Sequence, residues 1–396
     1  MMNDGREVVV LSGVRTAIGD YGGGLKDIAP TELAARVVRE AVSRARVAPE
    51  DVGHVVFGNV IHTEPKDMYL SRVACINGGL PKETPALTVN RLCGSGLQAI
   101  VSAAQAIKLG DTDVAVAGGA ESMSRGAYAD TSARWGARMG DHQVIDMMVG
   151  ALTDPFDTLH MGITAENVAA KWGITRQQQD EMALESNRRA VNAIQKGYFK
   201  DQVLPIEIKT RKGTVVVDTD EHPRADASME GFAKLKAVFK PDGSVTAGNA
   251  SGINDGAAAC VLMERNAAEK KGLKPMARLM AYAHAGVDPK YMGIGPVPAV
   301  RKVMERAGLK VSDMDVIESN EAFAAQACAV AKDLGFDLKK VNPNGGAIAL
   351  GHPIGATGAI LMVKAVYELQ RTGGRYGLVT MCIGGGQGIA AVFERL

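Results

Sequence analysis

The chain has 396 residues, too many for one ordinary hydrophobic core, so we expect two or three domains. Hydrophobic residues make up 46% and charged residues 22%, a balance typical of a soluble globular enzyme. The formal net charge of +1 argues against electrostatic binding to nucleic acid or to an anionic membrane, and no apolar run is long enough to span a bilayer. Five scattered cysteines without a signal peptide predict a reducing cytoplasm and no disulfide framework.

The first 121 residues alternate between predicted strands and helices. Strands are predicted at 7–13, 52–60 and 113–119, and helices at 31–46 and 97–109. In the second helix Gln98, Ser102, Gln105 and Lys108 form a single thin polar stripe. We therefore expect that helix to be buried over most of its surface.

The pattern changes at about residue 122 and stays different to about 249. This stretch is richer in charge, methionine and loops, and it lacks the alternation of strands and helices. Thr175 and Gln178 form a predicted capping box before an amphipathic helix that ends near Ile194. We interpret the stretch as an insertion that covers the functional site and not as a third independent core.

After residue 251 the first pattern resumes. Strands are predicted at 257–263, 277–286, 314–317, 376–381 and 389–394, and helices at 295–307, 322–334 and 359–369. A weak internal repeat supports two related halves, since 50–56 resembles 312–318 and Val89-Asn90 resembles Val341-Asn342. The prediction is an α/β fold whose two halves stack as helix, sheet, helix, sheet, helix.

A cysteine lies between a predicted strand and the mostly buried helix. Gly94 and Gly96 flank the turn after Cys93, so the backbone can bend sharply and a substrate carbonyl can come close. Free N–H groups and the positive end of the helix dipole favour thiolate over thiol there. We interpret Cys93 as a covalent nucleophile.

Three further loops are predicted at the same edge of the sheets, where ligands of open α/β folds collect. His352 can accept the Cys93 proton as a neutral imidazole, and Cys382, if partly thiolate, can remove a proton from carbon. Asn320 offers an amide to a water or an oxygen anion. The backbone N–H groups of Cys93 and Gly384 are candidate oxyanion donors.

Eight segments carry a resemblance to the thiolase family, in particular to the short-chain, bacterial biosynthetic-type acetyl-CoA acetyltransferases, or β-ketothiolases. They are spread from end to end in the family's order, which makes the set specific although each alone is weak. The segments are NRLCGSG at 90–96, GGAESM at 118–123, HMGITAEN at 160–167, AGNASG at 247–252, NEAFA at 320–324, NPNGG at 342–346, GHPIGATG at 351–358 and CIGGGQG at 382–388.

The resemblance implies a duplicated five-layer αβαβα fold with two mixed sheets and an inserted loop domain. The implied division is an N-terminal half at 1–123 and 250–275, a loop domain at 124–249 and a C-terminal half at 276–396. It also implies a ping-pong reaction in which an acyl group passes to Cys93 and then to a second acetyl-CoA by Claisen condensation, or the thiolytic reverse. The implied partners are acetyl-CoA, short acyl-CoA or 3-ketoacyl-CoA and further copies of the chain in a homotetramer or tight dimer.

By the same resemblance His352 is the base for Cys93, and Cys382 is the acid and base at the α-carbon. Asn320 with His352 forms one oxyanion hole, and the amides of Cys93 and Gly384 form the other. No cofactor and no metal are implied, because coenzyme A is a substrate. The positions that match the lining of the coenzyme A and substrate tunnel are Leu152, His160, Met161, Arg224, Phe239, Ala247, Ser251, Met292 and Phe323.

Other interpretations stay open at this point. The same fold serves decarboxylating ketoacyl synthases and acyl-CoA hydrolases, although a second cysteine argues for deprotonation of a carbon acid. A non-catalytic acyl-CoA or lipid carrier would need no paired thiols. Arg224 is near three acidic residues and is equally compatible with a solvated ion-pair surface. We expect Cys75, Cys260 and Cys328 to be structural. Acyl-chain preference, reaction direction and oligomeric state remain open.

Overall fold

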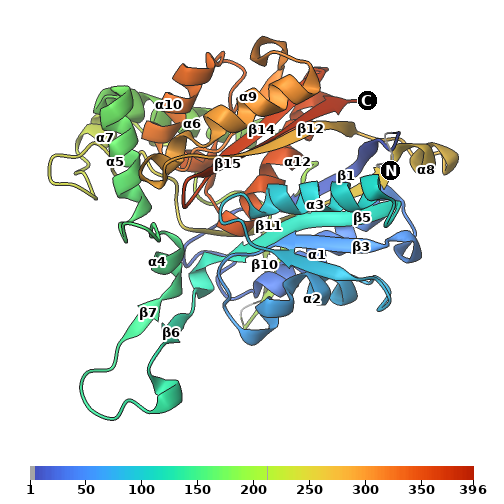
Figure 1. Ribbon diagram of the computed structural model, residues 1–396, viewed down its shortest axis with the longest axis horizontal. Coiled ribbons are helices and arrows are strands. Elements are labelled where there is room, and N and C mark those ends of the chain that lie inside the picture. The colour runs from blue at the N-terminus through green and yellow to red at the C-terminus, as the bar shows by residue number, and fades with distance from the viewer. Residues whose placement is uncertain (1–4, 212) are drawn as a thin grey trace.

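The computed structural model describes residues 5–211 and 213–396, in which eleven strands form two sheets that are continuous with each other and four more strands form two separate pairs (Figure 1). The pairing of Val9 with Arg278 and of Val10 with Ala277 joins the two sheets. The C-terminal sheet has the order β13 (Val316–Ser319), β14 (Tyr376–Ile383), β15 (Gln387–Arg395) and β12 (Ala277–Gly286). The N-terminal sheet continues with β1 (Val8–Thr16), β11 (Asn254–Glu264), β5 (Val114–Ser122), β3 (His54–Gly58) and β4 (Ala86–Val89), and β2 (Gly19–Asp20) and β8 (Val203–Leu204) pair at its side.

Both sheets are mixed, as predicted. In the N-terminal sheet β3 runs parallel to β4 and β5, whereas β11 runs antiparallel to β1 and β5. In the C-terminal sheet β13 and β14 are parallel, whereas β15 is antiparallel to both of its neighbours. Parallel strands in each half bring several strand ends to one edge, which is where the candidate loops begin.

Helices form three layers around the two sheets, so the predicted five-layer order is confirmed (Figure 1). Helices α1 (Pro30–Ala45) and α2 (Leu70–Asn77) cover the outside of the N-terminal half. Helices α9 (Pro296–Ala307) and α10 (Ala324–Leu334) cover the outside of the C-terminal half. Between the sheets lie α3 (Ser95–Leu109) and α12 (Ile354–Thr372), which contact each other and both halves.

The two central helices cross at glycines near their N-termini. A Cβ atom at Gly96 would lie 2.7 Å from the backbone N of Ala359, and one at Gly358 would collide with the backbone of Leu97. Larger residues would therefore separate the helices. Because Cys93 and His352 lie just before these helix starts, the close crossing also brings their two loops together.

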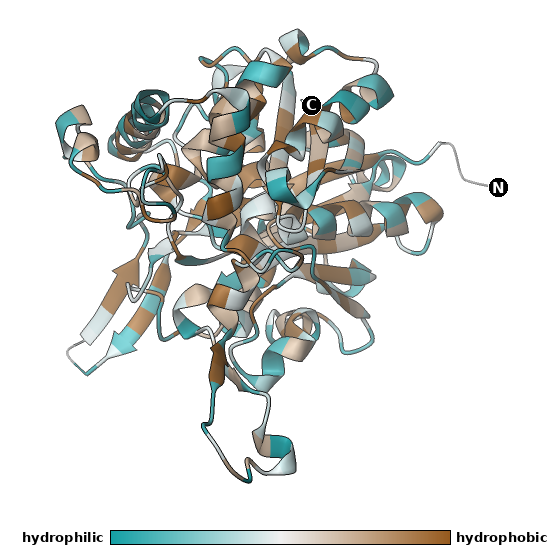
Figure 2. Ribbon diagram, turned by 60° about the vertical axis from the view of Figure 1, so that its left-hand side comes forward, coloured by the Kyte–Doolittle hydropathy of each residue, from teal (hydrophilic) through white to brown (hydrophobic). Residues whose placement is uncertain are grey.

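Helix α12 begins at residue 354, five residues earlier than predicted. The residues from 354 to 358 include two glycines and one threonine, which are weak helix formers. All five are buried, and the surrounding layers stabilise the helix there. Figure 2 shows the corresponding pattern, with hydrophobic residues concentrated in strands and central helices and hydrophilic residues on outward-facing helices.

The inserted stretch packs on the C-terminal half. Apolar residues of α5 (Met161–Trp172) share a cluster with Ala325 and Ala329 of α10, and α6 (Arg176–Gln195) begins with the predicted Thr175–Gln178 capping box. An arm formed by β6 (Tyr128–Asp130) and β7 (Val144–Asp146) projects away from the layers (Figure 1). The remaining elements are α4 (Met147–Ala151), β9 (Ile206–Thr210), β10 (Gly213–Val217), α7 (Met229–Ala233), α8 (Arg265–Lys270) and α11 (Ala347–Leu350). Within the described residues, no helix is both long and apolar enough to cross a membrane.

Candidate active site

Cys93 lies on a tight turn between β4 and α3. Leu92 has a φ of 44°, a left-handed conformation that is unfavourable for a leucine and that redirects the chain just before the cysteine. The Ser95 hydroxyl donates to the Leu92 carbonyl at 2.7 Å and accepts from the Arg91 N–H at 2.8 Å. These bonds fix the turn, so the thiol is held in place before a substrate arrives.

The Cys93 thiol is buried, and this burial raises its pKa to about 11. The backbone N–H groups of Gly384 and Cys93 act in the opposite direction, and the charge of Glu121 adds to the increase. The sequence-based expectation that the helix terminus favours the thiolate was therefore wrong. Desolvation outweighs the helix terminus, and Cys93 is a thiol at neutral pH.

Cys382 is fully buried near the end of β14, close enough to Cys93 for the two thiols to interact electrostatically. Burial raises the pKa of the Cys382 thiol, and the nearby Cys93 raises it further. Backbone packing brings the two turns together, because a Cβ at Gly94 would lie only 2.6 Å from Cδ1 of Ile383. The expected partial thiolate at Cys382 is absent at neutral pH for the same reason as at Cys93.

His352 is held by polar contacts on both ring nitrogens. Its Nδ1 lies 2.7 Å from the Thr357 hydroxyl, which itself donates to the Pro353 carbonyl. The hydroxyl must then accept from Nδ1–H, which leaves Nε2 unprotonated. Burial lowers the pKa of His352 to about 4, so the ring is neutral at physiological pH, as the sequence analysis expected.

Asn320 follows β13 and faces His352. Its Nδ2 lies 3.4 Å from His352 Nε2, and its backbone N–H donates to Thr380 of β14 at 3.0 Å. The side-chain oxygen of Asn320 is buried and has no hydrogen-bond partner among the described residues. An unpartnered buried amide oxygen beside an imidazole marks a polar position that a water or substrate can complete.

Glu121 connects the loops of the two halves, and the sequence analysis gave it no role. Its carboxylate accepts hydrogen bonds from Asn59 Nδ2, from the N–H groups of Val60 and Ile61, and from the N–H of Gly355, at 2.9 to 3.1 Å. Gly355 belongs to the segment that carries His352. Glu121 is inside the recognised GGAESM segment, but nothing in that pattern indicates which backbone groups the carboxylate binds.

Most of the predicted binding residues gather beside Cys382. Met161, Met292 and Cys382 share a small apolar cluster, against which Phe323 packs. His160 stacks on Phe239 with ring centroids 4.6 Å apart, and Phe239 meets Phe323 edge-on. The backbone of Leu152 accepts from Met161, and the backbone N–H of Ser251 donates to Ala322.

Arg224 and Ala247 lie elsewhere, around a shallow depression that also includes Asn187, His222 and Phe232. Both are exposed, and the Arg224 guanidinium has no ion pair among the described residues. Two of its acidic neighbours in sequence are engaged elsewhere, since Asp220 pairs with Arg15 and Glu221 binds backbone N–H groups. These contacts do not support the alternative interpretation that Arg224 is part of a solvated ion-pair surface.

All five cysteines are free thiols. Cys75 and Cys260 are buried in the core, and Cys328 lies half-buried on α10. The described residues contain no cluster of histidine, cysteine and carboxylate side chains suited to hold a metal ion.

Comparisons with known proteins extend over the whole chain. Residues 8–266 match the thiolase N-terminal domain, and residues 273–395 match the thiolase C-terminal domain. Beta-ketothiolase BktB of Cupriavidus necator is 70% identical, with 99% of this chain and 100% of that protein covered. An acetyl-CoA acetyltransferase of Syntrophomonas wolfei is 51% identical, with 99% and 100% covered.

Solved structures agree with this result. The crystal structure of the Bacillus anthracis acetyl-CoA acetyltransferase matches with a TM-score of 0.97 at 48% identity, covering 99% of both chains. The structure of human mitochondrial 3-ketoacyl-CoA thiolase in complex with CoA matches with a TM-score of 0.96 at 45% identity, covering 99% of this chain and 98% of the other.

Proposed function

The chain belongs to the thiolase family, and we propose that it transfers acyl groups between coenzyme A thioesters through an acyl-Cys93 intermediate. In one direction it condenses acetyl-CoA with a short acyl-CoA, and in the other it cleaves a short 3-ketoacyl-CoA with coenzyme A. The observation that carries the proposal is the pair of buried thiols in one pocket, with the Gly384 N–H directed at Cys93. An acyl carrier or a hydrolase has no need for the second thiol.

In the first half-reaction Cys93 sulfur attacks the thioester carbonyl, and the carbon–sulfur bond to coenzyme A breaks. His352 Nε2 takes the Cys93 proton and returns it to the departing coenzyme A sulfur. A pKa of about 11 for the thiol and about 4 for the imidazole makes proton transfer from Cys93 to His352 before the attack unfavourable. Proton transfer therefore accompanies attack, while the N–H groups of Cys93 and Gly384 stabilise the oxyanion.

In the second half-reaction Cys382 passes its thiol proton to His352 Nε2, while its sulfur removes a proton from the α-carbon of the incoming acetyl-CoA. The carbanion attacks the acyl-Cys93 carbonyl, a carbon–carbon bond forms, and the Cys93 sulfur leaves and takes the proton held on His352. The enolate oxygen that develops on acetyl-CoA is stabilised by the Nε2–H of protonated His352 and by a polar group held at Asn320. Thiolysis follows the same steps in reverse.

The substrate is an acyl-CoA or 3-ketoacyl-CoA, and no cofactor takes part because coenzyme A is itself exchanged. The aromatic and methionine side chains beside Cys382 line the acyl end of the site, where a short chain fits against Met161, Met292 and Phe323. Arg224 and Ala247 lie further out, at the depression where the nucleotide end of coenzyme A binds. The exposed Arg224 guanidinium without an ion pair is suited to a phosphate.

We also propose the division into an N-terminal half at 1–123 and 250–275, a loop domain at 124–249 and a C-terminal half at 276–396, acting as a homotetramer in the cytoplasm. Support for an oligomer comes from the projecting β6–β7 arm. Along it Tyr128 is 65% exposed, Trp135 85% and Met139 99%, a concentration of apolar surface that favours burial against another copy.

The test combines mass spectrometry with a steady-state assay. With acetyl-CoA alone the protein should gain one acetyl group on Cys93, and with acetoacetyl-CoA and coenzyme A it should form two equivalents of acetyl-CoA. A series extended to β-ketovaleryl-CoA and longer ketoacyl-CoA measures chain preference. Carbon–carbon bond formation that requires malonyl-CoA, or hydrolysis without transfer, would contradict the proposal.

A further inference from the structure

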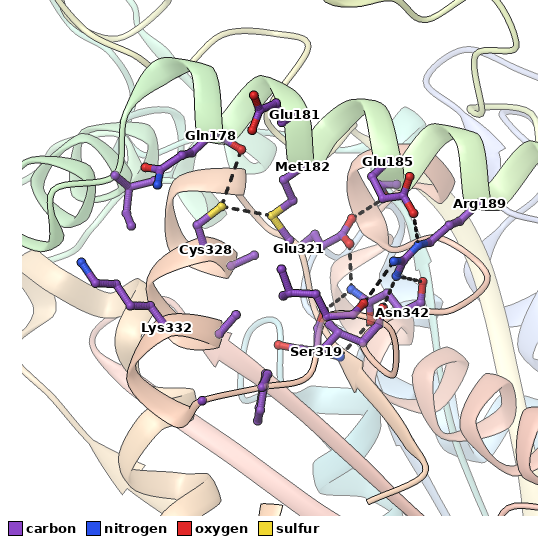
Figure 3. A pocket seen from close by; sticks show the side chains of 18 residues that line it. Gln178, Glu181, Met182, Glu185, Arg189, Ser319, Glu321, Cys328, Lys332 and Asn342 are labelled. Atoms are coloured by element: carbon purple, nitrogen blue, oxygen red, sulfur yellow. Dashed lines mark hydrogen bonds and ion pairs between the residues drawn. The ribbon is translucent and has the colours of Figure 1, made fainter. Parts of the chain in front are cut away.

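A second cavity, separate from the pocket of Cys93, lies between α6 and α10 (Figure 3). Its volume is about 600 Å³, which is within the range of small-molecule sites. None of the residues proposed above for catalysis or coenzyme A binding lines it. The apolar part of its wall consists of Ile174, Met182, Ala327, Cys328, Ala331, Phe336, Leu338 and Val341.

One polar group in this cavity has no partner. Ser319 is only 3% exposed, and its hydrogen bonds with Asn342 use its backbone N–H and carbonyl. Its hydroxyl makes no hydrogen bond with any described residue and is directed into the cavity in Figure 3. The hydroxyl oxygen is accessible from the cavity and has no protein partner among the described residues, so a ligand that forms one hydrogen bond there gains affinity.

The other polar groups of the wall are already engaged. Glu185 pairs with Arg188 and Arg189, and Arg189 also donates to the carbonyl groups of Val341 and Leu338. Lys332 donates to the Trp172 carbonyl at 3.0 Å. Lys332 has no carboxylate partner among the described residues, but its ammonium group points away from Ser319 in Figure 3.

The environment of Ser319 also excludes a negatively charged ligand group. Glu321 lines the same cavity, and its carboxyl group accepts from the Ser186 hydroxyl and from Asn342 Nδ2, both at 2.7 Å. A carboxylate placed beside this buried carboxyl group would lack a cationic partner. The head group that fits is therefore polar but uncharged.

We propose that the α6–α10 cavity binds an uncharged amphiphile, whose hydroxyl or carbonyl group hydrogen-bonds to Ser319 and whose aliphatic body packs between the two helices. Shape, apolar walls and the single unpartnered hydroxyl all favour this class of ligand over a fatty acid anion.

Occupancy of the cavity changes turnover, a consequence that rests on the proposed function. Ser319 and Glu321 flank Asn320, and the Asn342 side chain binds both of them. A ligand on Ser319 thus contacts the segment that holds Asn320 3.4 Å from His352. Small displacements of this segment alter the oxyanion site, so the cavity is coupled to the reaction.

The experiment measures binding of 1-octanol by calorimetry to the full-length protein and three variants. Ala331→Leu fills the cavity and should weaken binding at least tenfold, whereas Ser319→Ala removes the hydrogen bond and should weaken it three- to tenfold. Ala170→Leu, on the exposed side of α5, is the matched control and should bind like the wild type. Octanoate should bind more weakly than 1-octanol to the wild-type protein.

A measurement on the wild-type protein avoids dependence on folding of the variants. In methionine-methyl NMR, 1-octanol should shift the signal of Met182, which lines the cavity, and leave that of Met161 beside Cys382 unchanged. Shifts at Met161 alone, equal binding by Ala331→Leu, or tighter binding of octanoate would overturn the proposed site.

The effect of ligand binding in the α6–α10 cavity on turnover is measured separately, through kcat. Saturating 1-octanol should change kcat of the wild-type protein at least twofold and leave kcat of Ala331→Leu unchanged. An unchanged wild-type kcat overturns the coupling. Since binding is measured without turnover, failure of the thiolase proposal and failure of the ligand site give different results.

Discussion

The turns that carry Cys93 and Cys382 place two chemically identical groups in one pocket but give them different surroundings. Cys93 follows a left-handed leucine and precedes a helix, and it faces two backbone N–H groups that oppose the increase in its pKa. Cys382 lies near the end of a strand, fully buried, and the other thiol raises its pKa further. The difference suggests a division of labour, because the first thiol is prepared to hold an acyl group and the second to hold a proton.

The largest expected effect separates the two thiols. Cys93→Ala should abolish labelling by acetyl-CoA and lower turnover by about 10³-fold or more, since no acyl-enzyme forms. Cys382→Ala should lower overall turnover similarly but keep acetylation of Cys93, measured by intact-protein mass spectrometry. Cys328→Ala, which removes a half-buried thiol outside the pocket, is the control and should retain activity. Equal loss of acetylation in both pocket variants would refute the division of labour.

The next effect concerns Glu121, whose charge acts on Cys93 and whose carboxylate holds Gly355. In Glu121→Gln an amide N–H₂ faces backbone N–H groups, so hydrogen bonds are lost and we expect a loss of about 1–3 kcal/mol in the free energy of unfolding. Burial raises the pKa of Glu121 itself to about 8, so its carboxyl group is charged in the range where Cys93 titrates, and removal of that charge should lower the pKa of Cys93. The pH dependence of iodoacetamide alkylation measures this change, and an unchanged or higher pKa would contradict it.

The turn after Cys382 can be overpacked by a substitution at Gly384 that keeps both cysteines. A Cβ at Gly384 would collide with Cε of Met161, so Gly384→Ala should displace the Met161 side chain within the apolar cluster beside Cys382. We expect kcat/KM to fall about tenfold, in line with overpacking costs of about 1–3 kcal/mol. Met161→Ala in the same chain makes room and should restore part of the activity. No recovery in the double variant would show that the collision is not the cause.

The last effect is on the pH dependence of stability and comes from His352. Its pKa is about 4 when folded, against an ordinary value of 6.5, so below pH 6.5 the unfolded chain binds a proton that the folded chain does not. The stability contributed by the neutral ring is complete above pH 6.5 and decreases as pH falls towards 4. Between pH 6.5 and 5 this amounts to about 2 kcal/mol.

Urea unfolding of the wild type and His352→Asn at pH 7 and pH 5 provides the test. The variant lacks the titrating ring, so it should lose less stability over this interval than the wild type. Parallel losses in the two proteins would indicate that His352 is protonated in the folded state.

Much of the architecture was predictable from periodicity and from local sequence signals. The strand at 277–286 and the capping box at Thr175 and Gln178 were correct, because local pattern and hydrogen bonding decide them. The start of α12 was missed, because two glycines among its first five residues weaken the local helix signal, and only burial between the sheets holds them in a helix. The role of Glu121 was not predictable, since its partners come from separate stretches of chain.

The sequence by itself determined the α/β class and the order of the layers, and it supplied the candidate residues for the site. These follow from side-chain periodicity and from short segments whose residue types have few other uses. Only the tertiary structure decided the protonation states, because both thiols and the imidazole lose water when the helices cross at Gly96 and Gly358. The desolvation of a titratable group depends on all the elements that pack around it, so it cannot be predicted from a local sequence pattern.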